Sequence, residues 1–299
     1  MALGIHLRLL GVAFCWGISW PLGRVVAQNV EPFTAAAFRF LLASTLLLGW
    51  LHWRGALNIK ALSPKVWRGL SLGGLLGTFA YSVCFLMALR YMEAGKASVF
   101  VSISPAVTVL AAMVVFGERV NRLTLLGMGL CLIGALFALT GGKQSALTTG
   151  FHLGLGEWLL VAAMLLWAAY TLINRVLVRD LDPLVATALI FGMGSGLLVL
   201  GSLVVEGFTG WQHLFEASAT VWICMILLVL LSTVLAYAWY AQGIAALGAG
   251  TAAAYTILVP LFGVMSSVIF LGEPLTVGIV LGVCFALGGT WCMNRAKMK

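Results

Sequence analysis

Long apolar segments separated by short polar connections run through the whole chain. Each of ten segments is bounded by charge, Gly or Pro and is long enough to cross a bilayer as an α-helix, which takes about 20 residues. They are 7–27, 34–53, 66–88, 97–116, 121–140, 158–177, 184–205, 220–241, 250–271 and 276–293. The pattern predicts an all-α fold, a polytopic membrane protein with ten transmembrane helices.

Composition excludes a water-soluble globular protein. Of 299 residues, 62% are hydrophobic and 9% are charged, against roughly 25% charged in an ordinary soluble domain. The mean hydropathy is +1.09, and the nine acidic residues all lie outside the ten predicted helices. The connection 206–219 carries Trp211 and Phe215, whose amphipathic character suits the membrane interface.

The positive charge has a directional pattern. The net charge is +8, but the 17 Lys and Arg are dispersed at helix ends, which argues against nucleic-acid binding. Twelve of them fall on the side of the termini, four on the other side, and Arg39 lies inside the second helix. By the positive-inside rule both termini are cytoplasmic, as in a multi-pass protein of a bacterial-type inner (plasma) membrane. The basic N-terminus with its apolar segment is expected to be the first helix, uncleaved.

An internal repeat divides the chain. Trp16, Arg24 and Pro32 return as Trp167, Arg175 and Pro183, displaced by 151. A second block is displaced by 155: Thr78, Gly95, Pro105, Gly117, Glu118, Gly127 and Gly134 return as Thr233, Gly250, Pro260, Gly272, Glu273, Gly282 and Gly289. We therefore predict two five-helix repeats, 1–143 and 150–299. An odd number of helices inverts the second relative to the first, an architecture used for alternating access.

Several short motifs add a family resemblance. They are Trp-Gly-Ile-Ser-Trp at 16–20, Phe-Arg-Phe at 38–40, a mid-helix proline in helices 4 and 9, Gly-Glu-Arg at 117–119 and Gly-Glu-Pro at 272–274. Together they resemble the drug/metabolite transporter superfamily, EamA type, over essentially the whole chain. The resemblance implies transport of small organic solutes, as by the amino-acid and metabolite exporters of that superfamily.

With no acid at the membrane centre, a substrate site must be built from aromatic faces, hydroxyls and freed backbone groups. The candidates are Trp16, Ser19, Trp20, Tyr81, Phe85, Ser104, Trp167, Tyr170, Tyr237, Tyr240, Tyr255 and Thr256. The alternative is that such rings pack between helices or mark the water interface, although Trp16 and Trp167 lie near mid-span. Aromatic faces suit a zwitterion or a cation with an apolar part, such as an aromatic or large neutral amino acid. Cationic drugs and amino-acid-derived metabolites are the alternative substrates.

Two prolines and one arginine stand inside predicted helices. Pro105 and Pro260 each free a carbonyl four residues back and are candidate hinges, the alternative being packed kinks. Arg39 either extends to the headgroups or holds an anionic substrate group or a helix carboxyl end. Glycines 69, 73 and 77 form a seam on helix 3 that we expect to serve internal packing.

Charged repeat mates are candidate gates. Arg24 and Glu273 are assigned to the outer side, Arg175 and Glu118 to the inner side, and each pair would join the two halves. We hypothesise that one pair forms as the other separates. The alternative is that the acids cap helices, since exposed ion pairs contribute only about 0 to 1 kcal/mol.

Other classes of function fit less well. The four histidines lie at span ends or in connections, so neither a metal site nor a nucleophile with a base is expected, and no cofactor or enzyme activity is predicted. A channel would need rings of carbonyls or charges. The expected partners are the lipid bilayer and a small-molecule substrate, with a monomer favoured. Without a central carboxylate, movement down the solute gradient, or weak proton coupling at most, is expected.

Overall fold

The computed structural model describes residues 2–59, 62–141, 153–178, 181–297, and every regular element within these ranges is helical. Within the described ranges, ten helical stretches are long and apolar enough to span a membrane. Each coincides with a predicted segment to within a few residues, which confirms the all-α, ten-helix prediction. One of the shifted boundaries places an acid in a span: α9 begins at Leu155 rather than 158, so Glu157 lies in its first turn.

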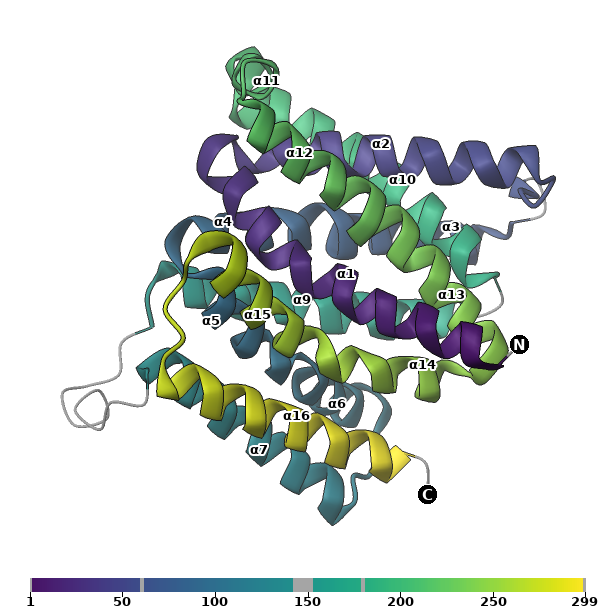
Figure 1. Cartoon of the computed structure of the whole chain (residues 1–299). Helices are drawn as coiled ribbons and strands as arrows, with labels where there is room; N and C mark the ends of the chain where they lie inside the picture. Colours follow the sequence, from purple (N-terminus) through teal and green to yellow (C-terminus); the bar gives the residue numbers. More distant parts are fainter. Residues whose placement is uncertain (1, 60–61, 142–152, 179–180, 298–299) are drawn as a thin grey trace.

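The helices pack as one layered bundle (Figure 1). In the first half the spans are α1 (Ala2–Asn29); α2 (Pro32–Trp53); α3 (Pro64–Gly73) with η2 (Gly74–Ala80) and α4 (Tyr81–Tyr91); α5 (Ala94–Phe100) with η3 (Val101–Ile103) and α6 (Ser104–Phe116); and α7 (Arg122–Thr140). In the second half they are α9 (Leu155–Leu177); α10 (Pro183–Val205); α12 (Ala219–Leu227) with η4 (Leu228–Leu235) and α13 (Ala236–Leu247); α14 (Ala249–Tyr255) with η5 (Thr256–Leu258) and α15 (Val259–Leu271); and α16 (Val277–Lys297). The short helix α11 (Gly207–Phe215) carries Trp211 and Phe215.

Local sequence signals begin and end these helices. Side-chain oxygens of Asn121 and Asp182 accept backbone N–H bonds at the starts of α7 and α10, satisfying donors that a helix cannot use internally. Gly117 and Gly272 end α6 and α15 with φ of 66° and 65°, a left-handed conformation that favours glycine. These two are repeat mates, so corresponding spans end by the same device.

The two halves also share their departures from α-helical geometry. The π-helical segments η2 and η4 interrupt the third and eighth spans at nearly the same repeat position, and the 3₁₀ segments η3 and η5 precede Pro105 and Pro260. Such segments free or displace backbone hydrogen bonds. The prolines therefore do interrupt their helices, as expected, whereas nothing in the sequence pattern predicted the π-helical segments.

Close glycine contacts join the halves. A methyl group added at Gly127 would lie 2.5 Å from the carbonyl oxygen of Gly289, and one at Gly134 would lie 2.7 Å from that of Gly282. The 155-residue displacement exchanges these two contacts, as a two-fold axis between α7 and α16 would produce. Phe40 and Phe191, mates at a displacement of 151, also touch, with ring centroids 4.9 Å apart. The inverted arrangement in a membrane stays a prediction.

The seam of glycines on the third span serves internal packing. A side chain at Gly69 would collide with Leu177 of α9, and one at Gly77 with the ring of Tyr170. Absence of a side chain thus lets the third span approach α9 closely.

The bundle has two ends, and each is named here by the glutamate that it carries. At the Glu273 end, α1 and α15 finish and α2 and α5 begin. At the Glu118 end, α6 and α13 finish and α1 begins.

Candidate functional site

A first aromatic cluster joins helix α1 to α13. The ring of Trp16 lies 5.4 Å from that of Tyr237 and 5.1 Å from that of Tyr240. Tyr237 continues the cluster to Phe191 of α10, at 5.1 Å. Trp16 belongs to the first half and both tyrosines that it contacts belong to the second, so a movement between the halves would change these contacts.

A second cluster joins α4 to α9 in the corresponding way. Trp167, the repeat mate of Trp16, lies 5.3 Å from Tyr81 and 5.2 Å from Tyr170. Tyr81 also stacks on Phe85 at 6.1 Å, and Phe85 meets Trp20 at 5.0 Å. Each tryptophan thus packs on a tyrosine of the opposite half.

The rings of the two clusters differ in exposure. Trp20 and Phe85 are buried, whereas Trp16, Trp167 and the four tyrosines keep accessible surface. Tyr81, Tyr170 and Tyr237 are partly buried and pack against the main hydrophobic core. The surface that these rings keep is where a solute could contact them. Trp20 and Phe85 are placed as packing residues behind it.

Arg39 of α2 reaches the same region. Its Nε donates to the hydroxyl of Thr233 in η4 at 2.9 Å, and its guanidinium carbon lies 5.1 Å from the centre of the Phe40 ring. Phe40 in turn contacts Phe191 of the first cluster, with ring centroids 4.9 Å apart. The guanidinium is therefore held between the halves and does not extend to the headgroups.

Four candidates lie apart from the two aromatic clusters. Tyr255 bonds to Nδ1 of His6 at 2.6 Å, toward the Glu118 end. Ser19 and Thr256 donate to carbonyls of their own helices, so these hydroxyls satisfy backbone. Ser104 begins α6 and accepts from Thr108 through its carbonyl. Hydroxyls in helices commonly bond back one turn, which is why sequence spacing alone did not separate these residues from a binding face.

Both gate pairs are formed in this one conformation. Arg24 Nε lies 3.6 Å from Glu273, and Arg175 lies 2.6 Å from Glu118. We expected one pair to form as the other separates, whereas this conformation contains both pairs. Glu273 also caps a helix, because its two oxygens accept the N–H groups of Ala94 and Gly95, each at 2.8 Å. Pairing and capping, posed as alternatives, coexist at this residue.

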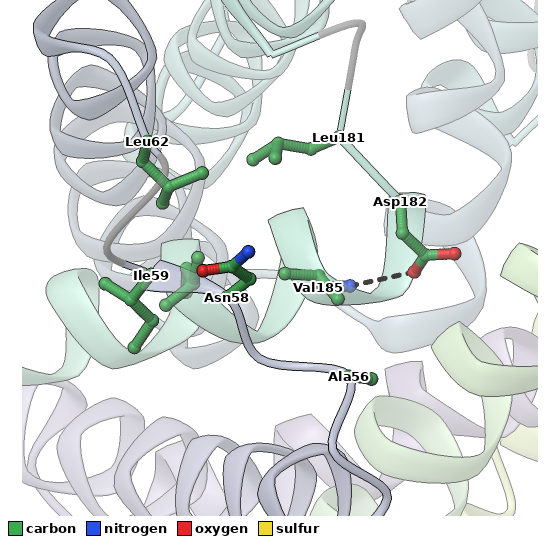
Figure 2. A pocket seen from close by; sticks show the side chains of 8 residues that line it. Ala56, Asn58, Ile59, Leu62, Leu181, Asp182 and Val185 are labelled. Atoms are coloured by element: carbon green, nitrogen blue, oxygen red, sulfur yellow. Dashed lines mark hydrogen bonds between the residues drawn. The ribbon is translucent and has the colours of Figure 1, made fainter.

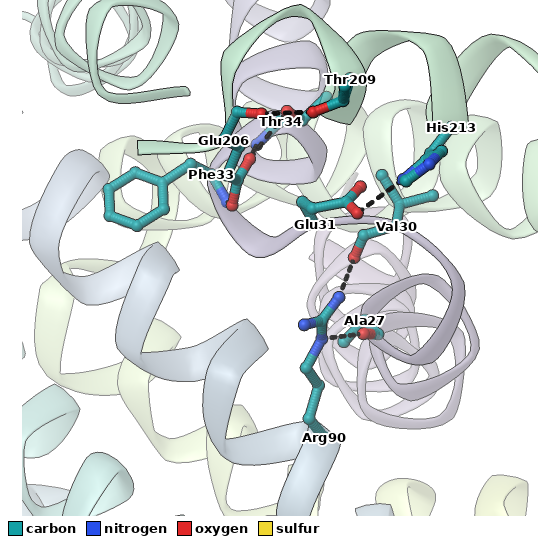
Figure 3. Close-up of polar contacts among 9 residues, drawn as sticks. All are labelled: Ala27, Val30, Glu31, Phe33, Thr34, Arg90, Glu206, Thr209 and His213. Carbon is teal, nitrogen blue, oxygen red and sulfur yellow. Dashed lines mark hydrogen bonds and ion pairs between the residues drawn. The ribbon is translucent and has the colours of Figure 1, made fainter. Parts of the chain in front are cut away.

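Further polar contacts at the Glu273 end were missed by sequence reasoning (Figure 3). Arg90, at the end of α4, donates to the carbonyls of Ala27 and Val30, the second at 2.9 Å. Glu206 accepts the N–H groups of Phe33 and Thr34, at 2.8 and 2.7 Å, across 172 or more residues. Both side chains complete helix ends that belong to other segments. The positions of Arg90 and Glu206 at span ends indicate a capping role, but they do not predict which helix end each side chain caps.

Glu31 and His213 complete this network, with a distance of 2.7 Å. The hydrogen bond that His213 donates to Glu31, and then the negative charge of Glu31, raise the pKa of His213 above its ordinary value. The pair links the start of α2 to α11 and lies outside the spans.

A separate shallow pocket lies at the Glu118 end, between the connection after α2 and the start of α10 (Figure 2). The pocket is lined by residues of the connections before α3 and α10 and by residues at the start of α10. They are Ala56, Asn58, Ile59, Leu62, Leu181, Asp182, Val185 and Leu189. Asp182 on its rim is already engaged, accepting from the N–H of Val185 at 3.1 Å. None of the predicted site residues lines this pocket.

Comparison with known proteins agrees with this architecture. The EamA-like transporter family matches residues 3–140 and again residues 154–295. The chain belongs to the EamA-like transporter family. It is accordingly a multi-pass membrane protein of a transporter family, which confirms the resemblance noted in the motifs and disfavours a membrane enzyme.

Individual relatives cover nearly the full length. A probable amino-acid metabolite efflux pump of Salmonella typhimurium is 27% identical, over 94% of this chain and 91% of its own. An uncharacterized transporter of Archaeoglobus fulgidus is 28% identical, over 98% and 97%. A solved crystal structure superposes with a TM-score of 0.66 at 18% identity, covering 97% of this chain and 96% of that one. That likeness supports the fold.

Proposed function

We propose that this transporter exports amino acids or related metabolites, above all those with an aromatic or large neutral side chain, by alternating access. The observation that carries the proposal is the pair of aromatic clusters, in which Trp16 and Trp167 each meet a tyrosine of the other half. A solute held against these rings touches both halves at once. A shift of one half against the other then moves its access from one end to the other.

The relatives support the same direction of transport. The Salmonella typhimurium protein is a probable efflux pump for amino-acid metabolites, and an Escherichia coli protein of the same description is 25% identical. The charge pattern supports cytoplasmic termini, which would set the Glu273 end outside. In that orientation the contacts of Glu273, Arg90 and Glu206 lie on the outer side.

The test is transport of an amino-acid panel by the purified protein in liposomes. Trp16→Ala and Trp167→Ala are expected to lower the transport rate at least about tenfold, as for loss of a well-packed aromatic contact with a ligand, while the fold in detergent persists. Trp158→Ala is the matched control, because Trp158 lies on the same helix as Trp167 but is 58% exposed.

Two outcomes would contradict the proposal. Absence of transport for every amino acid in the panel would overturn the substrate class. Unchanged transport by both tryptophan variants would remove the aromatic clusters from the path. A packing role, by contrast, would lower thermal stability without changing the transport of the molecules that remain folded.

A further inference from the structure

The positive charge of Arg39 has no anionic partner in the part of the chain that the structure describes. Its Nε bonds to Thr233, but its two terminal nitrogens donate to no described protein group. Neither nitrogen is among the buried polar atoms that are sealed from accessible space and lack a partner. The two terminal nitrogens therefore keep accessible surface and are free to donate to a ligand.

An unpaired charge at this depth is costly in a membrane and is retained where it serves a function. Arg39 is the eighth residue of α2, about 10 Å along the helix from its start at 1.5 Å per residue. Thr233 holds the guanidinium in place, since its hydroxyl accepts from Nε and donates to the carbonyl of Leu228. The Arg39 guanidinium is thus held in one position between the halves and does not extend to the headgroups.

We infer that Arg39 is the carboxylate-binding residue of the solute site, so that transported solutes carry a carboxylate beside an aromatic or apolar part. This inference rests on the proposed function and narrows it. The planar guanidinium presents paired N–H donors that match the two oxygens of a carboxylate. Phe40, whose ring lies 5.1 Å from the guanidinium carbon, contacts Phe191 of the first aromatic cluster, which would receive the apolar part.

The same geometry disfavours cationic drugs, because a solute with positive charge alone would meet like charge at Arg39. A zwitterionic amino acid avoids this conflict by placing its ammonium group over an aromatic face.

The internal repeat shows that the subsite occurs once. In the other half, Ile190 occupies the position of Arg39 and Thr78 that of Thr233. Thr78, like Thr233, is fully buried, and its hydroxyl has no hydrogen-bond partner among the described residues. The two equivalent threonines thus differ in that only Thr233 has an arginine beside it, and Thr78 serves as the matched control.

The experiment compares each transported amino acid with its amide, which has the same side chain but no carboxylate. In liposomes, wild type is expected to transport L-phenylalanine at least about tenfold faster than L-phenylalaninamide, the factor that a charged hydrogen-bonded pair supplies. Arg39→Gln should abolish this preference, and Arg39→Lys should keep part of it. Thr233→Val should weaken the preference, whereas Thr78→Val should leave it unchanged.

A purely structural role for Arg39 would lower stability and rate for both solutes and leave their ratio intact. Equal transport of acid and amide by wild type, or an unchanged ratio in Arg39→Gln, would overturn the inference while the proposed function stood. If no amino acid is transported, the proposed function fails. The inference is then decided by thermal stabilisation with phenylacetate against phenylacetamide: stabilisation by the acid alone, lost in Arg39→Gln, supports it, and any other result overturns it.

Discussion

The two ends of the bundle use the same pair of residue types in opposite ways. At the Glu273 end, Arg24 and Glu273 are 3.6 Å apart with side chains 21% and 9% exposed. At the Glu118 end, Arg175 and Glu118 are closer, at 2.6 Å, but 56% and 41% exposed. Water and salt weaken an exposed pair, whereas a buried carboxylate cannot exchange its partners for water. The longer contact is therefore the stronger anchor.

The repeat makes this difference informative. Glu273 bonds to the first N–H groups of α5, and its mate Glu118 is instead engaged with Arg175. If the halves exchange conformations, we expect Glu118 to cap α14 near Gly250, the mate of Gly95, and Glu273 to release α5. Ion pairing would then persist while helix capping alternates between the ends.

The largest effect is expected from removing the charge of Glu273. Glu273→Gln weakens two charge-assisted bonds to α5 and leaves the half-buried Arg24 without a counter-charge. We expect a loss of about 2–4 kcal/mol of unfolding free energy, measured by thermal unfolding in detergent. Glu118→Gln is the matched control, with a loss below about 1 kcal/mol. Equal losses for the two variants would show that burial does not separate the ends.

A smaller effect is expected at Glu206, which caps α2 through three hydrogen bonds from Phe33 and Thr34. Glu206→Gln should cost about 1–2 kcal/mol, the range for loss of a helix cap, and should raise the reactivity of a cysteine placed at Thr34 toward a water-soluble thiol reagent. The exposed Glu216 at the end of α11 serves as control, and Glu216→Gln should change neither quantity. An unaltered thiol reactivity in Glu206→Gln would show that this cap does not hold the Glu273 end closed.

At the Glu118 end we expect a change in conformation rather than in stability. Arg175→Glu or Glu118→Arg alone should shift the populations of two nearly equal states by about fivefold, as for 1 kcal/mol, and the double variant should restore them. Accessibility of a cysteine in place of Tyr240, whose side chain keeps accessible surface, measured separately from each side of the membrane, reports the shift. Identical accessibility in the single and double variants would exclude a role for this pair in gating.

The smallest effect is expected from His213, which is exposed. Glu31 raises its pKa in the folded protein, so the contact stabilises the fold fully below about pH 6.5, the ordinary value for histidine. That contribution disappears as the pH rises through the elevated pKa. Compared with His213→Gln, wild type should therefore lose thermal stability as the pH rises above about 6.5. Parallel pH profiles for the two proteins would show that the pair contributes nothing.

The sequence by itself determined the ten spans, the duplication and the family. Each span can be predicted because a helix in lipid satisfies its backbone internally and needs no distant partner. Gly117 and Gly272 end their helices by local conformation alone, and Trp16 and Trp167 could be singled out by repeat position and depth.

Only the tertiary structure decided which polar groups meet. Glu206 caps a helix that begins more than 170 residues earlier. Arg39 donates a hydrogen bond to Thr233 of the other half. Tyr255 is hydrogen-bonded to His6 and lies outside the aromatic clusters. Helical periodicity predicts on which face of its helix a residue lies, but not which residue of another helix it contacts. The partners of these side chains depend on how the two halves pack, and that packing is set by close contacts such as Gly127 against Gly289, which have no counterpart in local sequence.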